Sequence, residues 1–167
     1  VFDKYTRTAM ALESGADLVV ELPPIFASSS AEDFASCGVA LLDALGVVSH
    51  LCFGSESGNL EELSSAADLL AAESEEYQQV LRQHLKDGYP FPQARAAAFS
   101  FCSPKTDPEL LSQPNNTLGI EYLKAIKKQN SPVTPVTIKR MGSGYHEAVI
   151  SSDQPMASAT AIRAVLE

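Results

Sequence analysis

Val47-Val48-Ser49-His50-Leu51-Cys52-Phe53 is a short apolar run, and Gly54 ends it. A run of this length, with β-branched and aromatic residues and a glycine at its end, is typical of a buried β-strand. Gly46 closes a helical pattern just before the run, and Asn59 opens another helical pattern just after it. A helix, a buried strand and a second helix in this order predict an α/β architecture.

The same alternation extends toward both ends of the chain. Two more apolar runs predict strands, at Leu18–Leu22 and Val133–Lys139. Helical patterns surround the predicted strands, over residues 3–14, 29–45, 59–86, 91–101, 117–129 and from 158 onward. We therefore expect a doubly wound parallel sheet, Rossmann-like, in one domain over 1–167. The helix-rich stretch 59–103 is expected to be an insertion that caps this sheet.

Composition and charge narrow the class of protein. The chain has 167 residues, 45% hydrophobic and 20% charged, which is typical of a globular domain. Its formal net charge of −9 disfavours a nucleic-acid-binding platform, and Lys124, Lys127 and Lys128 fit an ordinary solvated helix face. No apolar run approaches the ~20 residues of a membrane helix. We expect no membrane association and a cytoplasmic location.

The cysteines predict neither a zinc cluster nor a disulfide framework. There are three, at positions 37, 52 and 102, with no CxxC pair. Cys37 lies in a helical pattern and Cys52 in the central strand, so both are predicted to be small buried hydrophobic residues. No metal site is expected from the protein side chains. Glu21 ends a predicted strand, where pairing with a nearby Lys or Arg is the favoured interpretation.

Ser158-Ala159-Thr160-Ala161-Ile162-Arg163 is the strongest candidate for phosphate binding. Ser158 and Thr160 stand at the start of a predicted helix, and Arg163 follows within its first turn. Backbone N–H groups, two hydroxyls and one guanidinium can converge there on an anion. An ordinary Ser N-cap followed by a solvent-exposed Arg is the competing interpretation.

Three other positions are candidate nucleotide contacts. Gly54 removes side-chain bulk where a ligand approaches the end of a strand. In Pro114-Asn115-Asn116-Thr117, Asn116 is the expected N-cap, which leaves the amide of Asn115 for a ligand. Arg140 follows the strand 133–139 and can bind phosphate in bidentate fashion. A plain turn at Gly54 and an exposed strand end at Arg140 remain open alternatives.

Six segments in this order resemble the bacterial tRNA(Met) cytidine acetate ligases, which belong to the HIGH-type nucleotidyltransferases. The matching segments begin at Lys4, Gly15, Phe53, Pro114, Ser143 and Ser158: KYTRTAMAL, GADLVVELP, FGSE, PNNTLG, SGYH and SATAIR. The resemblance implies that such proteins use ATP and acetate to form acetyl-adenylate. They then acetylate N4 of the wobble cytidine of elongator tRNA(Met).

The resemblance also implies roles for individual residues. Gly54, Asn115 and Arg140 would contact ATP, while the segment 158–163 matches the closing phosphate motif of the superfamily. Mg²⁺ is expected to bridge the phosphates. Catalytic residues are not assigned by the match.

One departure from the family pattern matters. The family's ATP site includes an HxGH segment, and none of the three histidines here, at positions 50, 84 and 146, has that context. The chain begins at Val1 without Met, so we expect an N-terminally truncated catalytic domain that does not catalyse adenylation alone. A noncatalytic nucleotide- or RNA-associated module, or another adenylyltransferase of the superfamily, remains an alternative.

Overall fold

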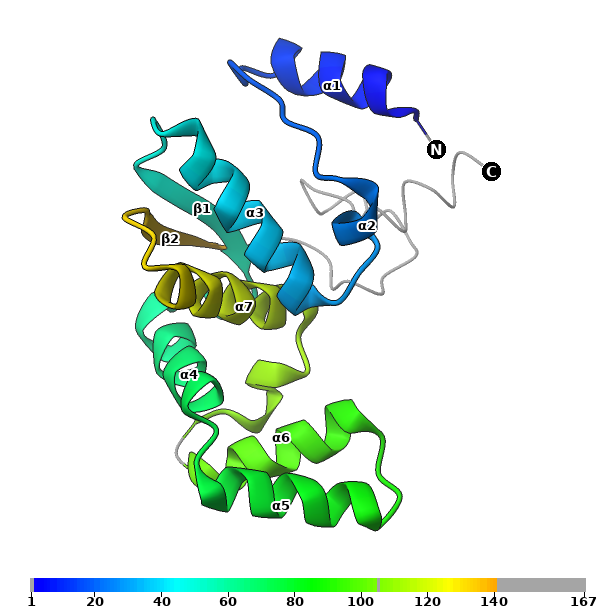
Figure 1. Ribbon diagram of the computed structural model, residues 1–167, viewed down its shortest axis with the longest axis vertical. Helices are drawn as coiled ribbons and strands as arrows, with labels where there is room; N and C mark the ends of the chain where they lie inside the picture. The colour runs from blue at the N-terminus through cyan, green and yellow to red at the C-terminus, as the bar shows by residue number, and fades with distance from the viewer. Residues whose placement is uncertain (1, 105, 141–167) are drawn as a thin grey trace, which may run out of the picture. The chain divides into compact units, whose positions relative to one another are not determined.

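The computed structural model describes residues 2–104 and 106–140, which fall into two compact units. Within the described residues, the fold is mostly helical α/β with one small parallel sheet. Figure 1 shows the order of the elements along the chain. Ser158, Thr160 and Arg163, and the tyrosine and histidine at 145 and 146, lie outside the described residues.

The first unit contributes residues 2–23, with helix α1 at Lys4–Glu13. Asp3 is its N-cap, as the sequence predicts, and accepts a hydrogen bond from the backbone N–H of Thr6 at 2.9 Å. The Lys4 Nζ lies 2.9 Å from Glu21 Oε1, which confirms the expected pairing of Glu21. The predicted strand at Leu18–Leu22 is wrong for the described residues, because this extended segment has no strand partner among them.

The second unit, Pro24–Arg140, holds the sheet. Strands β1 (His50–Ser55) and β2 (Thr134–Lys139) pair in parallel, with Gly54 opposite Ile138 and Ser55 opposite Lys139. Both strands are confirmed within a few residues of their predicted bounds. The predicted doubly wound sheet is larger than this pair, so only the coarser α/β assignment holds.

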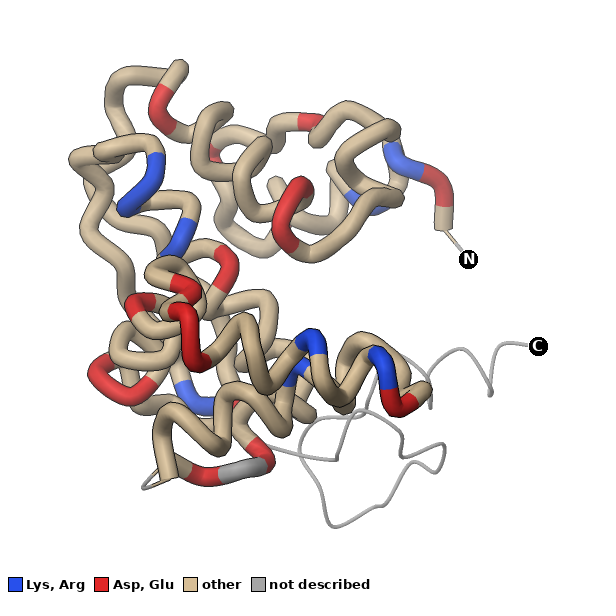
Figure 2. The backbone as a smooth tube through the Cα atoms, turned by 60° about the horizontal axis from the view of Figure 1, so that its bottom comes forward, with Lys and Arg blue, Asp and Glu red and all other residues tan. Residues whose placement is uncertain are grey.

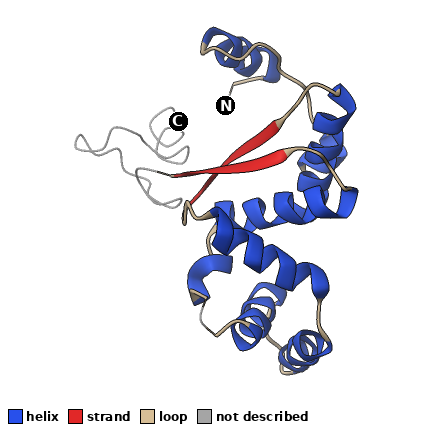
Figure 3. Cartoon of the chain, turned by 90° about the vertical axis from the view of Figure 1, so that its left-hand side faces the viewer, coloured by secondary structure: helices blue, strands red, loops and turns tan. Residues whose placement is uncertain are grey.

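Six α-helices and a 3₁₀ turn complete the described part of the second unit. Their bounds are α2 Pro24–Ala27, α3 Ala31–Leu45, α4 Leu60–Ala72, α5 Glu75–Lys86, α6 Phe91–Cys102, η1 Pro108–Leu111 and α7 Pro114–Gln129. Helix α7 packs against β1, while α3 and α4 pack against α7 (Figures 1 and 3). Helices α5 and α6 pack against each other. None of the described helices combines the length and apolar character needed to cross a bilayer.

The apolar core lies between the sheet and these helices. Alternation along β1 buries Leu51, Phe53 and Ser55 and exposes His50, Cys52 and Gly54. The prediction that Cys52 is buried is therefore wrong, because its side chain points to the open face of the sheet; Cys37 is half-buried. Other core side chains come from the helices and from the residue before β2: Val39, Leu63, Leu70, Phe99, Ile120, Leu123, Ile126 and Val133.

Helix starts in this unit follow local capping chemistry. Asn59 caps α4 by accepting from the N–H of Glu62, as predicted. For α3 the N-cap is Ser30, one residue after the start of the predicted helical pattern at 29. The hydroxyls of both serines donate to the carboxylate of Asp33, and these bonds lower the pKa of Asp33 below its ordinary value. The two adjacent serines thus act together on one carboxylate.

Candidate functional site

The carboxyl ends of β1 and β2 bring two predicted site residues together. The backbone N–H of Arg140 donates to the carbonyl of Ser55 at 2.8 Å, which extends the strand pairing by one residue. A Cβ built on Gly54 would lie 3.4 Å from Cγ of Arg140. Both residues are exposed, on the open side of the sheet edge. In parallel sheets this edge is where ligands bind.

Ser55 fixes the turn that follows β1. Its side chain is fully buried, and its Oγ lies 2.6 Å from the Oγ1 of Thr137 on β2. The same Oγ accepts a hydrogen bond from the N–H of Gly58 at 3.0 Å. Gly58 has a φ of +65°, and a Cβ there would lie 2.5 Å from the Cβ of Lys139. The turn therefore depends on a small residue at 58 and a short hydroxyl at 55.

Glu56 joins this turn to the start of α7. Its Oε1 accepts from the Asn115 side-chain amide at 2.6 Å and from the Asn115 backbone N–H at 3.3 Å. Its Oε2 accepts from the backbone N–H of Asn116 at 2.8 Å. A carboxylate at a helix N-terminus is stabilised by the unpaired N–H groups and by the helix dipole. Glu56 thus caps α7 from the turn that follows β1.

The predicted N-cap role of Asn116 is wrong. Helix α7 begins at Pro114, and Asn116 lies within its first turn, where it is 3% exposed. The Asn116 Oδ1 instead accepts a hydrogen bond from the backbone N–H of Ser57 at 3.0 Å. Proline is favoured in the first turn because its missing N–H would have no helical partner there. The two asparagines together bind the turn 55–58 to the helix.

Three of the six predicted contacts therefore lie in segments that the structure joins. Gly54 and Arg140 approach each other directly, and Asn115 binds Glu56 in the turn after Gly54. The other three predicted contacts, Ser158, Thr160 and Arg163, fall outside the described residues. Sequence reasoning missed the capping role of Glu56. It also missed Ser55 and Thr137, for which a hydroxyl side chain in or next to each predicted strand was the available signal.

The charges of the site are unevenly distributed. Because the Glu56 carboxylate occupies the N-terminus of α7, that end of the helix is already neutralised. The positive charge at the sheet edge comes from Lys139 and Arg140. Beneath the edge, the ring of Phe53 packs against the ring of Tyr122, with 5.8 Å between their centroids. Burial raises the pKa of Tyr122 above its ordinary value of 10.0. The described residues contain no group of three or more His, Cys, Asp or Glu that could hold a metal ion.

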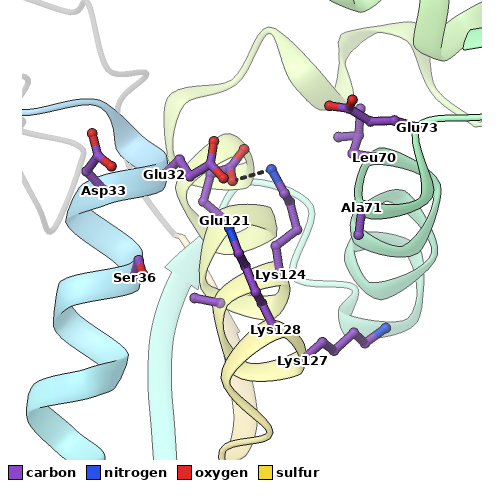
Figure 4. A pocket seen from close by; sticks show the side chains of 11 residues that line it. Glu32, Asp33, Ser36, Leu70, Ala71, Glu73, Glu121, Lys124, Lys127 and Lys128 are labelled. Carbon is purple, nitrogen blue, oxygen red and sulfur yellow. Dashed lines mark ion pairs between the residues drawn. The ribbon is translucent and has the colours of Figure 1, made fainter. Parts of the chain in front are cut away.

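A hollow lies between α3, α4 and α7, with a volume of about 620 Å³ (Figure 4). Three lysines of α7 line it, but Lys124 lies 2.7 Å from the buried Glu121 carboxylate and Lys127 pairs with Asp68. Figure 2 shows basic and acidic positions interspersed along the tube. Lys127 and Lys128 are exposed, as the predicted helix face requires. For Lys124 that prediction is wrong, because its side chain is only 18% exposed and is paired with a buried carboxylate.

Comparisons with known proteins agree on the family. The HIGH Nucleotidyl Transferase family matches residues 1–167. A tRNA(Met) cytidine acetate ligase of Clostridium perfringens (strain SM101 / Type A) is 44% identical over 96% of this chain and 42% of its own length. One from Caldanaerobacter subterraneus subsp. tengcongensis is 44% identical over 100% of this chain and 41% of its own length. The chain thus spans about two fifths of these relatives.

Solved structures give the same result. Thermotoga maritima TmcAL in its apo form matches with a TM-score of 0.90 and 38% identity, over 99% of this chain and 40% of that chain. TmcAL from the same organism bound with alpha-thio ATP matches with a TM-score of 0.84 and 38% identity, over 99% of this chain and 39% of that chain. The chain belongs to the HIGH nucleotidyl transferase family, in the branch of the tRNA(Met) cytidine acetate ligases.

Proposed function

We propose that this chain forms part of the ATP site of an ATP-dependent tRNA(Met) cytidine acetate ligase. The observation that carries the proposal is the junction of three segments at one sheet edge: the turn after Gly54, the start of α7 at Asn115, and Arg140 after β2. The identity to ligases of this name and the likeness to a TmcAL structure with alpha-thio ATP support it.

Each residue has a proposed role set by its chemistry. Gly54 has no Cβ, which leaves room beside it for the Arg140 side chain and lets the nucleotide approach the backbone at this edge. The Arg140 guanidinium binds phosphate oxygens, and Asn115 holds the nucleotide through its side-chain amide. Ser158, Thr160 and Arg163 complete the phosphate contacts.

We propose that Mg²⁺ binds through the nucleotide and not through side chains of the described residues. These residues include no cluster of carboxylates or imidazoles suited to a metal ion. The phosphates of ATP are oxygen donors of the kind that Mg²⁺ prefers. A bound ion would therefore arrive with the nucleotide.

The proposed reaction has two steps. An acetate oxygen attacks the α-phosphorus of ATP, the bond to the β-phosphate oxygen breaks, and acetyl-adenylate and pyrophosphate form. The N4 amine of the wobble cytidine of elongator tRNA(Met) then attacks the acetyl carbon, loses a proton and releases AMP. Negative charge grows on phosphate oxygens in the first step, so fixed cationic groups such as Arg140 stabilise the transition state.

The larger architecture follows from the same proposal. We propose that 1–167 belongs to one catalytic domain whose sheet is doubly wound, with 59–103 as a helical insertion. The Leu18–Leu22 segment supports this, since Leu18, Val19 and Val20 are exposed and the segment has no strand partner among the described residues; Leu18 is 64% exposed. The absence of an HxGH segment from these 167 residues supports the further proposal that they do not catalyse adenylation alone.

The test combines binding with turnover in the full-length protein. Calorimetric titration of ATP is expected to show weaker binding in Arg140→Ala and in Asn115→Ala, by about tenfold or more for the charged contact. Glu61→Gln, an exposed acidic residue of α4, is the control and is expected to bind ATP normally. Acetate-dependent release of pyrophosphate and acetylation of tRNA(Met) are expected in the unaltered protein. ATP binding without either activity would favour the noncatalytic nucleotide-binding alternative.

A further inference from the structure

We infer that Glu56 orients the Asn115 side chain so that its Oδ1 faces the nucleotide. This oxygen accepts a hydrogen bond from a donor on the nucleoside and does not contact a phosphate. The inference rests on the proposed function, because it assumes that ATP binds beside Asn115. It assigns Glu56 a positioning role, which acts on the ligand through Asn115.

The orientation of the Asn115 amide follows from its partner. An ionised carboxylate only accepts hydrogen bonds, and Glu56 Oε1 lies 2.6 Å from the Asn115 Nδ2. The reversed amide would place two acceptor oxygens at this distance, which is unfavourable. The Asn115 NH₂ group is therefore committed to Glu56. Its Oδ1 accepts no hydrogen bond from any residue in the ranges 2–104 and 106–140.

The carboxylate itself is held firmly. Two backbone N–H groups, those of Asn115 and Asn116, donate to its two oxygens at 3.3 and 2.8 Å. Since these groups belong to the first turn of α7, Glu56 cannot rotate away without leaving helix donors unpaired. Asn115 is half-buried, so its free oxygen has access to a ligand at the edge of the site. Asn115 Oδ1 is therefore a hydrogen-bond acceptor held in one orientation.

The groups beside Asn115 and Arg140 differ in charge. Next to Asn115 lie an amide oxygen and a carboxylate, and both repel phosphate oxygens. The cationic end lies at Arg140, after β2. The nucleoside of ATP carries two kinds of hydrogen-bond donor, the exocyclic amine of adenine and the ribose hydroxyls. Either kind matches Oδ1, whereas a triphosphate offers only acceptors.

The experiment measures discrimination among nucleotides in the full-length protein. Calorimetry compares ATP with purine riboside triphosphate, which lacks the amine, and with 2′-deoxy-ATP and 3′-deoxy-ATP, which each lack one hydroxyl. One of the three analogues is expected to bind about tenfold more weakly than ATP, the usual effect of one lost hydrogen bond. That analogue identifies the donor. If all three bind within twofold of ATP, the inference is wrong.

Glu56→Gln then tests the positioning role. A glutamine places an NH₂ group against one of the donors now bound by Glu56, so the Asn115 amide loses its fixed direction. We expect the variant to bind ATP and the discriminating analogue equally, with Glu61→Gln unchanged. Asn115→Ala keeps the backbone capping bonds to Glu56 and is expected to lose the same discrimination. This second variant provides the test if the Glu56→Gln protein does not fold.

The outcomes separate the two claims. If Glu56→Gln folds and still discriminates tenfold, Glu56 does not position Asn115. If Asn115→Ala binds ATP with unchanged affinity, the residue does not contact the nucleotide, and the proposed ATP site itself is misplaced. Loss of discrimination in both variants, with the control unchanged, supports the inference.

Discussion

Replacing Gly119 by alanine tests the packing that supports the site. Gly119 is buried in the middle of α7, and a Cβ there would lie 2.5 Å from Cε2 and 3.1 Å from Cδ2 of Phe53. The Phe53 ring is only 8% exposed and packs against Tyr122, so it has little freedom to withdraw. Phe53 also directly precedes Gly54. A displaced ring therefore strains the end of β1 where the nucleotide is proposed to bind.

Two opposing effects set the magnitude. Alanine favours a helix over glycine by about 1 kcal/mol. Overpacking of a filled core costs about 1–3 kcal/mol, and a contact at 2.5 Å to a buried ring lies toward the upper part of that range. We expect Gly119→Ala to lower the free energy of unfolding by about 1–2 kcal/mol.

Gly38→Ala is the matched control in α3. A Cβ at Gly38 would lie 3.7 Å from Cε1 of Tyr122, an ordinary van der Waals distance. Only the helix preference then remains, so this variant is expected to gain up to about 1 kcal/mol. Urea unfolding of both variants beside the unaltered protein measures the difference. If Gly119→Ala is as stable as Gly38→Ala, Phe53 does not fill the space that the structure assigns to it.

Three further outcomes are expected. Gly58→Ala should lower stability by about 2 kcal/mol or more, because φ is +65° and the new Cβ meets that of Lys139 at 2.5 Å; thermal unfolding measures it. Arg95→Ala should lower the free energy of unfolding, measured in urea, by about 2–3 kcal/mol, because the buried Glu121 carboxylate loses a partner at 2.7 Å. The loss is limited because Lys124 still pairs with Glu121. Burial raises the pKa of Tyr122, so its contribution to stability is complete below pH 10.0 and is lost as pH rises further; Tyr122→Phe should flatten that alkaline loss in pH-dependent unfolding.

Local chemistry made much of the fold predictable. Asn59 and Asp3 cap their helices where the sequence places them, because a cap is a contact within three residues. The run that includes Leu51 and Phe53 forms a strand because its alternate side chains fill the core. The off-by-one start of α3 has a local cause as well. Ser29 and Ser30 are adjacent hydroxyls bound to one acidic side chain, and only the second has the N-cap geometry.

Contacts between distant segments were not predictable. The cap of α7 comes from Glu56, 60 positions before the Asn116 N–H that it binds, and no local pattern specifies such a pair. Asn116 therefore resembles an N-cap in sequence but is used differently in the structure. The segment at Leu18–Leu22 has strand-like composition, yet strand formation requires a partner, which the described residues do not provide. The motif at 158–163 stays a prediction.

We propose above all that one sheet edge binds ATP, with the nucleoside at Asn115 and the phosphates at Arg140. A crystal structure of the full-length protein with a non-hydrolysable ATP analogue would locate the nucleotide. The claim predicts a nucleoside donor within about 3.2 Å of Asn115 Oδ1 and phosphate oxygens on the Arg140 guanidinium. A nucleotide bound elsewhere, or phosphates lying against Glu56, would contradict it.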